Sequence, residues 1–105
     1  MKRKLHELAH ARAGDKGDTL TLSLFALRDV DYPLLVAQVT ADAVKRHLAY
    51  IVRGEVRRYE LPHLHALQFV CERALDTGVT TSLALDPHGK SLSYALLELS
   101  IDAAP

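Results

Sequence analysis

The chain contains a single cysteine, Cys71, and no tryptophan among its 105 residues. One cysteine excludes an internal disulfide and a metal site built from several thiolates. The sequence also lacks an apolar run of about 18 residues, the length that a membrane-spanning helix requires. Its basic first residues are not followed by the apolar segment of a signal peptide. We therefore expect a cytoplasmic protein with no membrane contact.

The chain also lacks a net charge, because thirteen Lys and Arg residues balance thirteen Asp and Glu residues. A nucleic-acid-binding domain carries a clear positive excess, so no nucleic-acid partner is predicted. Hydrophobic residues make up 49% of the chain and charged residues 25%, which is ordinary for a globular protein. The length predicts one domain over residues 1–105, whose small core would gain stability from association.

Alternation of apolar and polar residues predicts strands at residues 4–11 and 20–27. In the second strand the leucines at even positions share one face, and Thr and Ser occupy the other. Phe25 and Leu27 fall on that otherwise polar face, with no helix left to cover them. We therefore expect a homo-oligomer in which a second copy covers this face.

The middle of the chain predicts two helices around one strand. A helical turn follows Asp31, and a helix begins after the N-cap Thr40 and ends before Gly54. The charged strand 55–61 is expected at a sheet edge. The next helix is predicted over residues 63–77, and its apolar stripe contains the cysteine.

The last third of the chain predicts a strand at residues 79–86 and a turn in "DPHG". For residues 91–101 a helix that finishes in extended chain is preferred, although a strand fits nearly as well. Together these elements predict an α+β two-layer sandwich, with a mainly antiparallel four-stranded sheet and helices on one face.

The segment "HARAGDKGDT", residues 10–19, is either a hairpin turn or a binding site. A hairpin needs only a two-residue turn, whereas this segment spends about eight residues, which favours a function. Its glycines would let backbone N–H groups approach a carboxylate or phosphate, beside basic side chains. The candidate ligand- or partner-binding residues are His10, Arg12, Gly14, Asp15, Lys16, Gly17, Asp18 and Thr19.

Other templates for this segment fail. An EF-hand loop that starts at Asp15 would have Gly17 at its third position and Ala26 at its twelfth, where oxygen ligands are required. A dinucleotide fingerprint needs G-x-G-x-x-G at the start of a helix, but here G-x-x-G precedes a strand.

The remaining motifs do not predict chemistry. "HGKS" at residues 88–91 lacks the first glycine of a P-loop. No H-E-x-x-H motif is present, and on a helix His63 and His65 would point about 200° apart, so no metal site is predicted. A nucleophile elbow is absent as well. We expect no cofactor, and the sequence assigns no catalytic residue.

Several longer stretches resemble one known family over nearly the whole chain. "AHARAGDKGDT", "VRGEVRRYELPHLHALQFV" and "SLALDPHGKSLSYALLEL" are similar to the ferredoxin-like domain at the C-terminus of AtuA-family acyclic terpene utilisation proteins. Ala13 replaces the serine that is usual in this family, and His63 stands where asparagine is commoner. The resemblance implies a ferredoxin-like fold, and it carries no assigned catalytic residue onto this chain.

In that family the domain is usually fused behind a larger AtuA domain, in pathways that degrade acyclic terpenoids or branched acyl-CoA compounds. The resemblance therefore implies a non-catalytic accessory or binding subunit, here a separate chain that acts with a separately encoded AtuA-type protein or as a homo-oligomer. The alternative is a small free-standing enzyme that acts on a CoA-linked or carboxylate substrate through residues 12–19.

Overall fold

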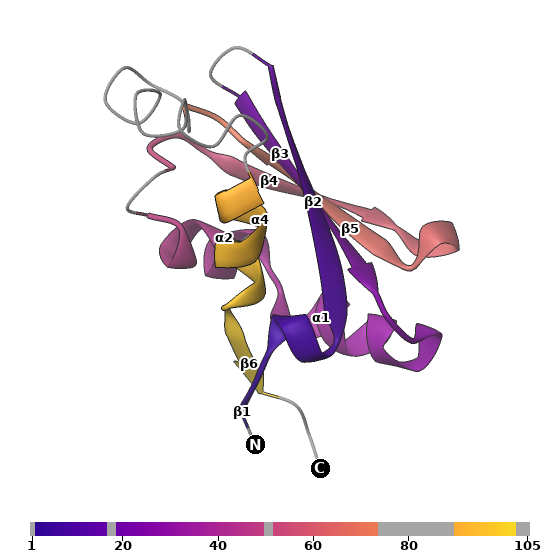
Figure 1. Cartoon of the computed structure of the whole chain (residues 1–105). Helices are drawn as coiled ribbons and strands as arrows, with labels where there is room; N and C mark the ends of the chain where they lie inside the picture. The colour runs from indigo at the N-terminus through magenta and orange to yellow at the C-terminus, as the bar shows by residue number, and fades with distance from the viewer. Residues whose placement is uncertain (1, 17–18, 50–51, 74–89, 103–105) are drawn as a thin grey trace.

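The computed structural model describes residues 2–16, 19–49, 52–73 and 90–102 (Figure 1). Its larger sheet has four antiparallel strands in the order β2-β3-β5-β4. These strands are β2 (Ala9–Lys16), β3 (Thr19–Ala26), β4 (Val56–Leu61) and β5 (Ala66–Cys71). A smaller antiparallel sheet pairs β1 (Lys2–Lys4) with β6 (Ser100–Asp102) and so joins the two ends of the described chain.

Helices cover one side of the larger sheet. They are α1 (Tyr32–Gln38), α2 (Ala41–His47) and α4 (Lys90–Leu97). Pro33 lies in the first turn of α1, where a missing N–H costs nothing, and the Thr40 side chain accepts a 3.0 Å hydrogen bond from the Ala43 N–H to begin α2. In Figure 1, α2 and α4 lie with the small sheet on the same side of the large sheet. The predicted α+β sandwich is therefore confirmed.

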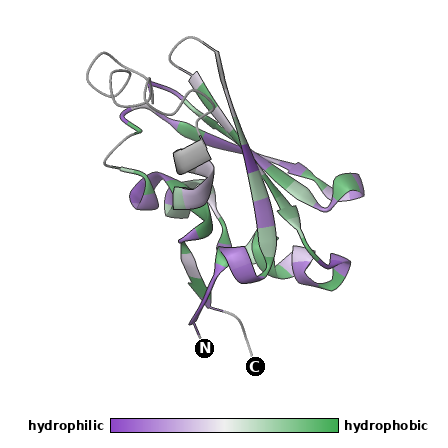
Figure 2. Ribbon diagram, in the orientation of Figure 1, coloured by the Kyte–Doolittle hydropathy of each residue, from purple (hydrophilic) through white to green (hydrophobic). Residues whose placement is uncertain are grey.

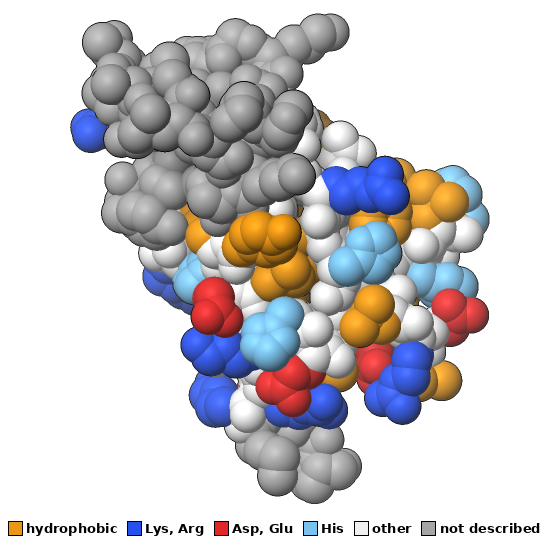
Figure 3. Space-filling model, viewed as in Figure 1, with side chains coloured by type: hydrophobic (Ala, Val, Ile, Leu, Met, Phe, Trp, Pro, Cys, Tyr) orange, Lys and Arg blue, Asp and Glu red, His pale blue; other side chains and the backbone are white. Residues whose placement is uncertain are grey.

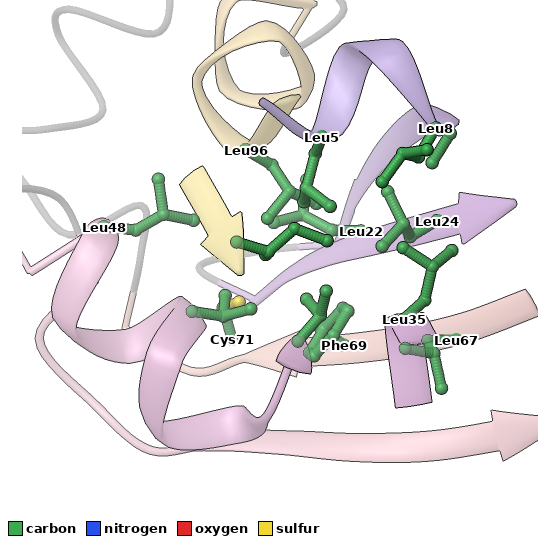
Figure 4. Packing of buried hydrophobic residues seen from close by; sticks show 14 of the residues in the cluster. Leu5, Leu8, Leu22, Leu24, Leu35, Leu48, Leu67, Phe69, Cys71 and Leu96 are labelled. Carbon is green, nitrogen blue, oxygen red and sulfur yellow. The ribbon is translucent and has the colours of Figure 1, made fainter. Parts of the chain in front are cut away.

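The core lies between the sheet and the helices (Figure 4). Leucines at every second position of β3 are fully buried, and they meet Leu35 of α1 and Leu96 of α4. This alternation, which Figure 2 shows as changes of hydropathy along the strands, fixes which face of the sheet turns inward. The opposite face of the sheet, turned away from the helices, carries polar side chains and partly buried apolar ones.

The predicted helix over residues 63–77 is wrong. Pro62–Leu64 forms a short 3-10 helix, η3, and the chain then enters β5. Leu67, Phe69 and Cys71 are all fully buried, which is a period of two, and they pair with β3 and β4 on either side. Pairing on both edges of this strand outweighs its weak helical periodicity. Residues 74–77 lie outside the described residues.

The other boundaries differ less from the expectations. The predicted strand 4–11 is split by η1 (Leu5–Glu7), so its residues belong to β1 and β2. The second helix ends at His47, earlier than expected. The tail forms a helix followed by a strand, so the preferred assignment of residues 91–101 is confirmed. The predicted strand 79–86 and the "DPHG" turn lie outside the described residues. None of the described helices is long and apolar enough to span a membrane.

Candidate functional site

The candidate site lies on the open face of the large sheet, which is the face opposite the helices. Because β3 buries its leucines, the residues between them and their partners on β2 occupy the open face. In this register His10 is opposite Phe25, Arg12 is opposite Ser23, and Gly14 is opposite Thr21. Three of the predicted site residues therefore lie in one row along β2.

Two stacked rings lie at the end of this row that is farther from the hairpin connection. The rings of His10 and Phe25 stack with their centroids 4.9 Å apart and their planes at 12°. His10 is exposed, and its ring shields part of Phe25, which is half-buried. This stack covers the aromatic residue that had seemed to need a partner chain, whereas Leu27, beyond the end of β3, remains 56% exposed.

Arg12 stands in the middle of the row and is exposed. It lies opposite Ser23, which in turn pairs with Gln68 of β5, so polar residues continue this line across the open face of the sheet. Arg12 forms no ion pair with any residue that the structure describes. A planar guanidinium in this setting can bind a carboxylate or phosphate through two parallel hydrogen bonds.

Gly14 has a structural role in the hairpin. The Thr21 hydroxyl donates a 3.2 Å hydrogen bond to the Gly14 carbonyl oxygen across the two strands. A Cβ at position 14 would lie 3.1 Å from the Thr21 Oγ1 atom, so a side chain here would press on that hydroxyl. Gly14 therefore allows a close contact between two neighbouring strands.

The expected eight-residue loop over residues 12–19 is wrong. β2 continues through Asp15 and Lys16, whose backbones pair with Leu20 and Thr19 of β3. Only positions 17–18, Gly17 and Asp18, separate the two strands, and they lie outside the described residues. The extra length that favoured a site is strand, so the remaining argument for binding rests on the row of side chains rather than on a loop.

Two further strands complete the open face. Arg57 and Tyr59 of β4 alternate with inward-facing residues, and Arg57 forms an ion pair with Glu72 that raises its pKa. Tyr59 is 49% exposed, and it lies opposite Gln68 of β5. The sequence predicted the strand 55–61 that carries Arg57 and Tyr59, but it placed Gln68 on a helix and so did not predict that Gln68 lies beside them.

A histidine outside the predicted site joins two turns at the other end of the sheet. The His65 Nδ1 atom lies 3.1 Å from the Asp29 Oδ1 atom, and its ring meets the edge of Tyr32 at 5.6 Å. His65 also adopts a left-handed backbone with φ of 49°. These contacts hold η2 (Asp29–Asp31) against the segment that enters β5, and a signal for them was absent from the sequence.

The surface of the described residues mixes charged, histidine and hydrophobic side chains. No group of three or more His, Cys, Asp and Glu residues could hold a metal ion among the residues that the structure describes. Figure 3 shows basic, acidic and histidine side chains scattered among hydrophobic ones on the side seen in Figure 1.

Comparison with known proteins identifies the family. The sequence model of the AtuA ferredoxin-like domain matches residues 3–102, which is nearly the whole chain. No match was found among curated proteins or among solved structures. The predicted ferredoxin-like architecture is thereby confirmed, and the chain belongs to the AtuA ferredoxin-like domain family.

Proposed function

We propose that this chain is a non-catalytic accessory subunit that binds an AtuA-type protein in the catabolism of acyclic terpenoids or branched acyl-CoA compounds. The family assignment supports this proposal, because domains of this kind are usually joined to a larger AtuA domain. A chain that carries the domain would then reproduce, between two molecules, a contact that is otherwise made within one.

The observation that carries the proposal is the exposed Arg12 on the open face of the sheet. Arg12 stands between the His10–Phe25 stack and the end of the hairpin, and it has no acidic partner among the described residues. Exposed arginine and aromatic side chains are enriched at protein contacts. The proposed partner therefore presents a carboxylate to Arg12 and an apolar group to the aromatic stack.

Lys16 extends the same proposal toward the hairpin connection. Its backbone pairs with Thr19 at the end of the two strands, three residues past Ala13 on β2. The sequence makes Lys16 a second candidate for contact with an anionic group. We therefore expect the partner's acidic surface to reach from the centre of the hairpin toward its tip.

Calorimetry with the purified AtuA-type protein of the same organism tests this function. Arg12→Ala and Lys16→Ala should each weaken binding about tenfold or more, because each removes a charge-assisted contact. The matched controls are Arg46→Ala and Lys45→Ala, which remove exposed basic residues from α2 on the helical side. The control variants should bind like the wild-type chain.

Two results would contradict the accessory role. In the first, the wild-type chain does not bind the AtuA-type protein; hairpin variants that bind as tightly as the controls would instead exclude Arg12 and Lys16 from the binding surface. In the second, the chain by itself turns over a CoA-linked or carboxylate substrate and loses that activity in Arg12→Ala. The second result would favour the alternative, a small free-standing enzyme.

A further inference from the structure

The strand β4 forms one edge of the large sheet, where its backbone can pair with a further strand. In the order β2-β3-β5-β4 it pairs with β5 on one side, and no strand lies on its other side within the residues that the structure describes. This edge is distant in strand order from β2, which carries Arg12. An inference about the edge is therefore independent of the proposed function.

The backbone hydrogen bonds show which groups of β4 point outward. The Glu72 N–H donates to the Glu55 carbonyl oxygen at 2.9 Å, just before the strand begins. In an antiparallel ladder, residues that exchange hydrogen bonds with the neighbouring strand alternate with residues whose N–H and C=O point away. Counting in steps of two from Glu55, the residues that bond to β5 are Arg57, Tyr59 and Leu61.

The intervening residues of β4 direct their backbone groups to the outer edge. These residues are Val56, Arg58 and Glu60. Exposed N–H and C=O groups in such a row are a template for pairing with another strand. A second copy of the same strand can add here in antiparallel orientation around a two-fold axis, which produces the same contact twice.

Charge selects one register for such a pair. If the axis passes between the two Tyr59 residues, Arg58 of each copy lies opposite Glu60 of the other. The N–H and C=O groups of Arg58 and Glu60 in both copies are then all hydrogen-bonded across the axis. An axis at Arg58 would instead place two arginines face to face, and an axis at Glu60 would place two glutamates face to face. Like charges directly opposite each other destabilise a sheet.

The side-chain contacts of Arg58 and Glu60 on β4 are compatible with this register. The Arg58 Nη1 atom donates to the carbonyl oxygens of Val36 and Val39 at 2.7 and 3.0 Å, which holds the guanidinium in place. Its Nη2 atom lies 3.0 Å from Glu60 Oε2, and half of the Glu60 side chain is exposed. Glu60 can therefore contact Arg58 of a second copy while the hydrogen bonds from its own Arg58 to Val36 and Val39 stay in place.

We propose that the chain forms a two-fold dimer through antiparallel pairing of β4, with Tyr59 facing its own copy at the axis. The two large sheets then form one continuous sheet. The open faces of both copies lie on the same side of it, so that each dimer presents two Arg12 surfaces in one direction.

Light scattering and disulfide trapping test the dimer and its register. Light scattering of the wild-type chain should give twice the 11.6 kDa mass of one chain. Residues facing each other at a non-hydrogen-bonded pair have Cα atoms about 4.5 Å apart, within the range of a disulfide. Tyr59→Cys should therefore form a covalent dimer under mild oxidation, and the native Cys71 is buried and will not compete.

Arg57→Cys is the matched control, since it lies on the same face two residues away. In the proposed register its Cα atoms lie about 13 Å apart along the strands, so it should remain uncoupled. Glu60→Arg, which sets arginine against arginine, should give the mass of a monomer. A monomeric wild-type chain, or coupling of Arg57→Cys without coupling of Tyr59→Cys, would overturn the proposal.

Discussion

At the scale of single residues, Tyr32 shows how one side chain joins distant parts of the chain. Its hydroxyl donates a 3.0 Å hydrogen bond to the carbonyl oxygen of Ala66, so the start of α1 is fixed to the start of β5. Burial, and then the nearby Glu60 carboxylate, raise the pKa of Tyr32. The neutral phenol is therefore the form that the fold stabilises.

Tyr32→Phe should lower the free energy of unfolding by about 1 kcal/mol at neutral pH, the usual net value of a hydrogen bond. Because the pKa is raised above 10.0 in the folded state, this stabilisation is complete below that pH and is lost as the pH rises through the raised pKa. Urea unfolding of both chains between pH 7 and about pH 11 measures it. Equal stability at neutral pH, or a difference that grows in alkali, would contradict this role.

Cys71 gives a second prediction at this scale. The side chain is fully buried, and burial raises the pKa of its thiol to about 11. Because the thiolate is the reactive form, a thiol reagent should label the native chain much more slowly than the chain in denaturant. Rapid labelling in native buffer would show that the core around β5 opens readily. The sequence predicted this burial correctly, although it placed Cys71 on a helix.

At the scale of elements, the start of β4 depends on a close approach of two backbones. The Gly54 N–H donates to the Glu72 carbonyl oxygen at 2.9 Å, and a Cβ at position 54 would lie only 2.5 Å from that oxygen. The sequence placed Gly54 at the end of a helix, where a positive φ would require it. In the structure, glycine is needed at this position because the neighbouring backbone at Glu72 lies too close to admit a Cβ.

Gly54→Ala should therefore destabilise the fold by roughly 1 to 3 kcal/mol, because a backbone carbonyl must shift to admit the methyl group. Gly14→Ala is the matched comparison, since its Cβ would meet the Thr21 hydroxyl at 3.1 Å. A side chain can rotate away, so this second change should cost less. Denaturant unfolding compares the two, and a larger loss for Gly14→Ala would contradict the account.

The elements also show what the sequence could predict. The alternating leucines of β3 and the N-cap Thr40 were recognised, because each signal is local and strong. β5 was mistaken for a helix, because its identity depends on pairing with β3 and β4 and its local periodicity is ambiguous. The hairpin residues were predicted to form a loop, because glycine and charged residues are common in turns. Here the same residues belong to two strands that continue almost to their connection.

At the scale of the whole molecule, the helices and the small sheet lie on one side of the large sheet, and no α-helix among the described residues covers its other side (Figure 1). The sequence could predict this architecture and the family. It named His10 and Arg12 as candidates, but it could not place them beside Phe25 and Gln68, because cross-strand register is set by pairing across the sheet. The central claim is that this open face binds the AtuA-type protein.

An NMR titration of the isotope-labelled chain with the purified AtuA-type protein tests that claim most directly. The amide signals of β2 and β3, above all those of Arg12 and Ser23, should shift or broaden first. The signals of α2 should change least, because that helix lies on the opposite side of the sheet. Changes confined to α2 and α4, or no change at a saturating concentration of the partner, would contradict the account.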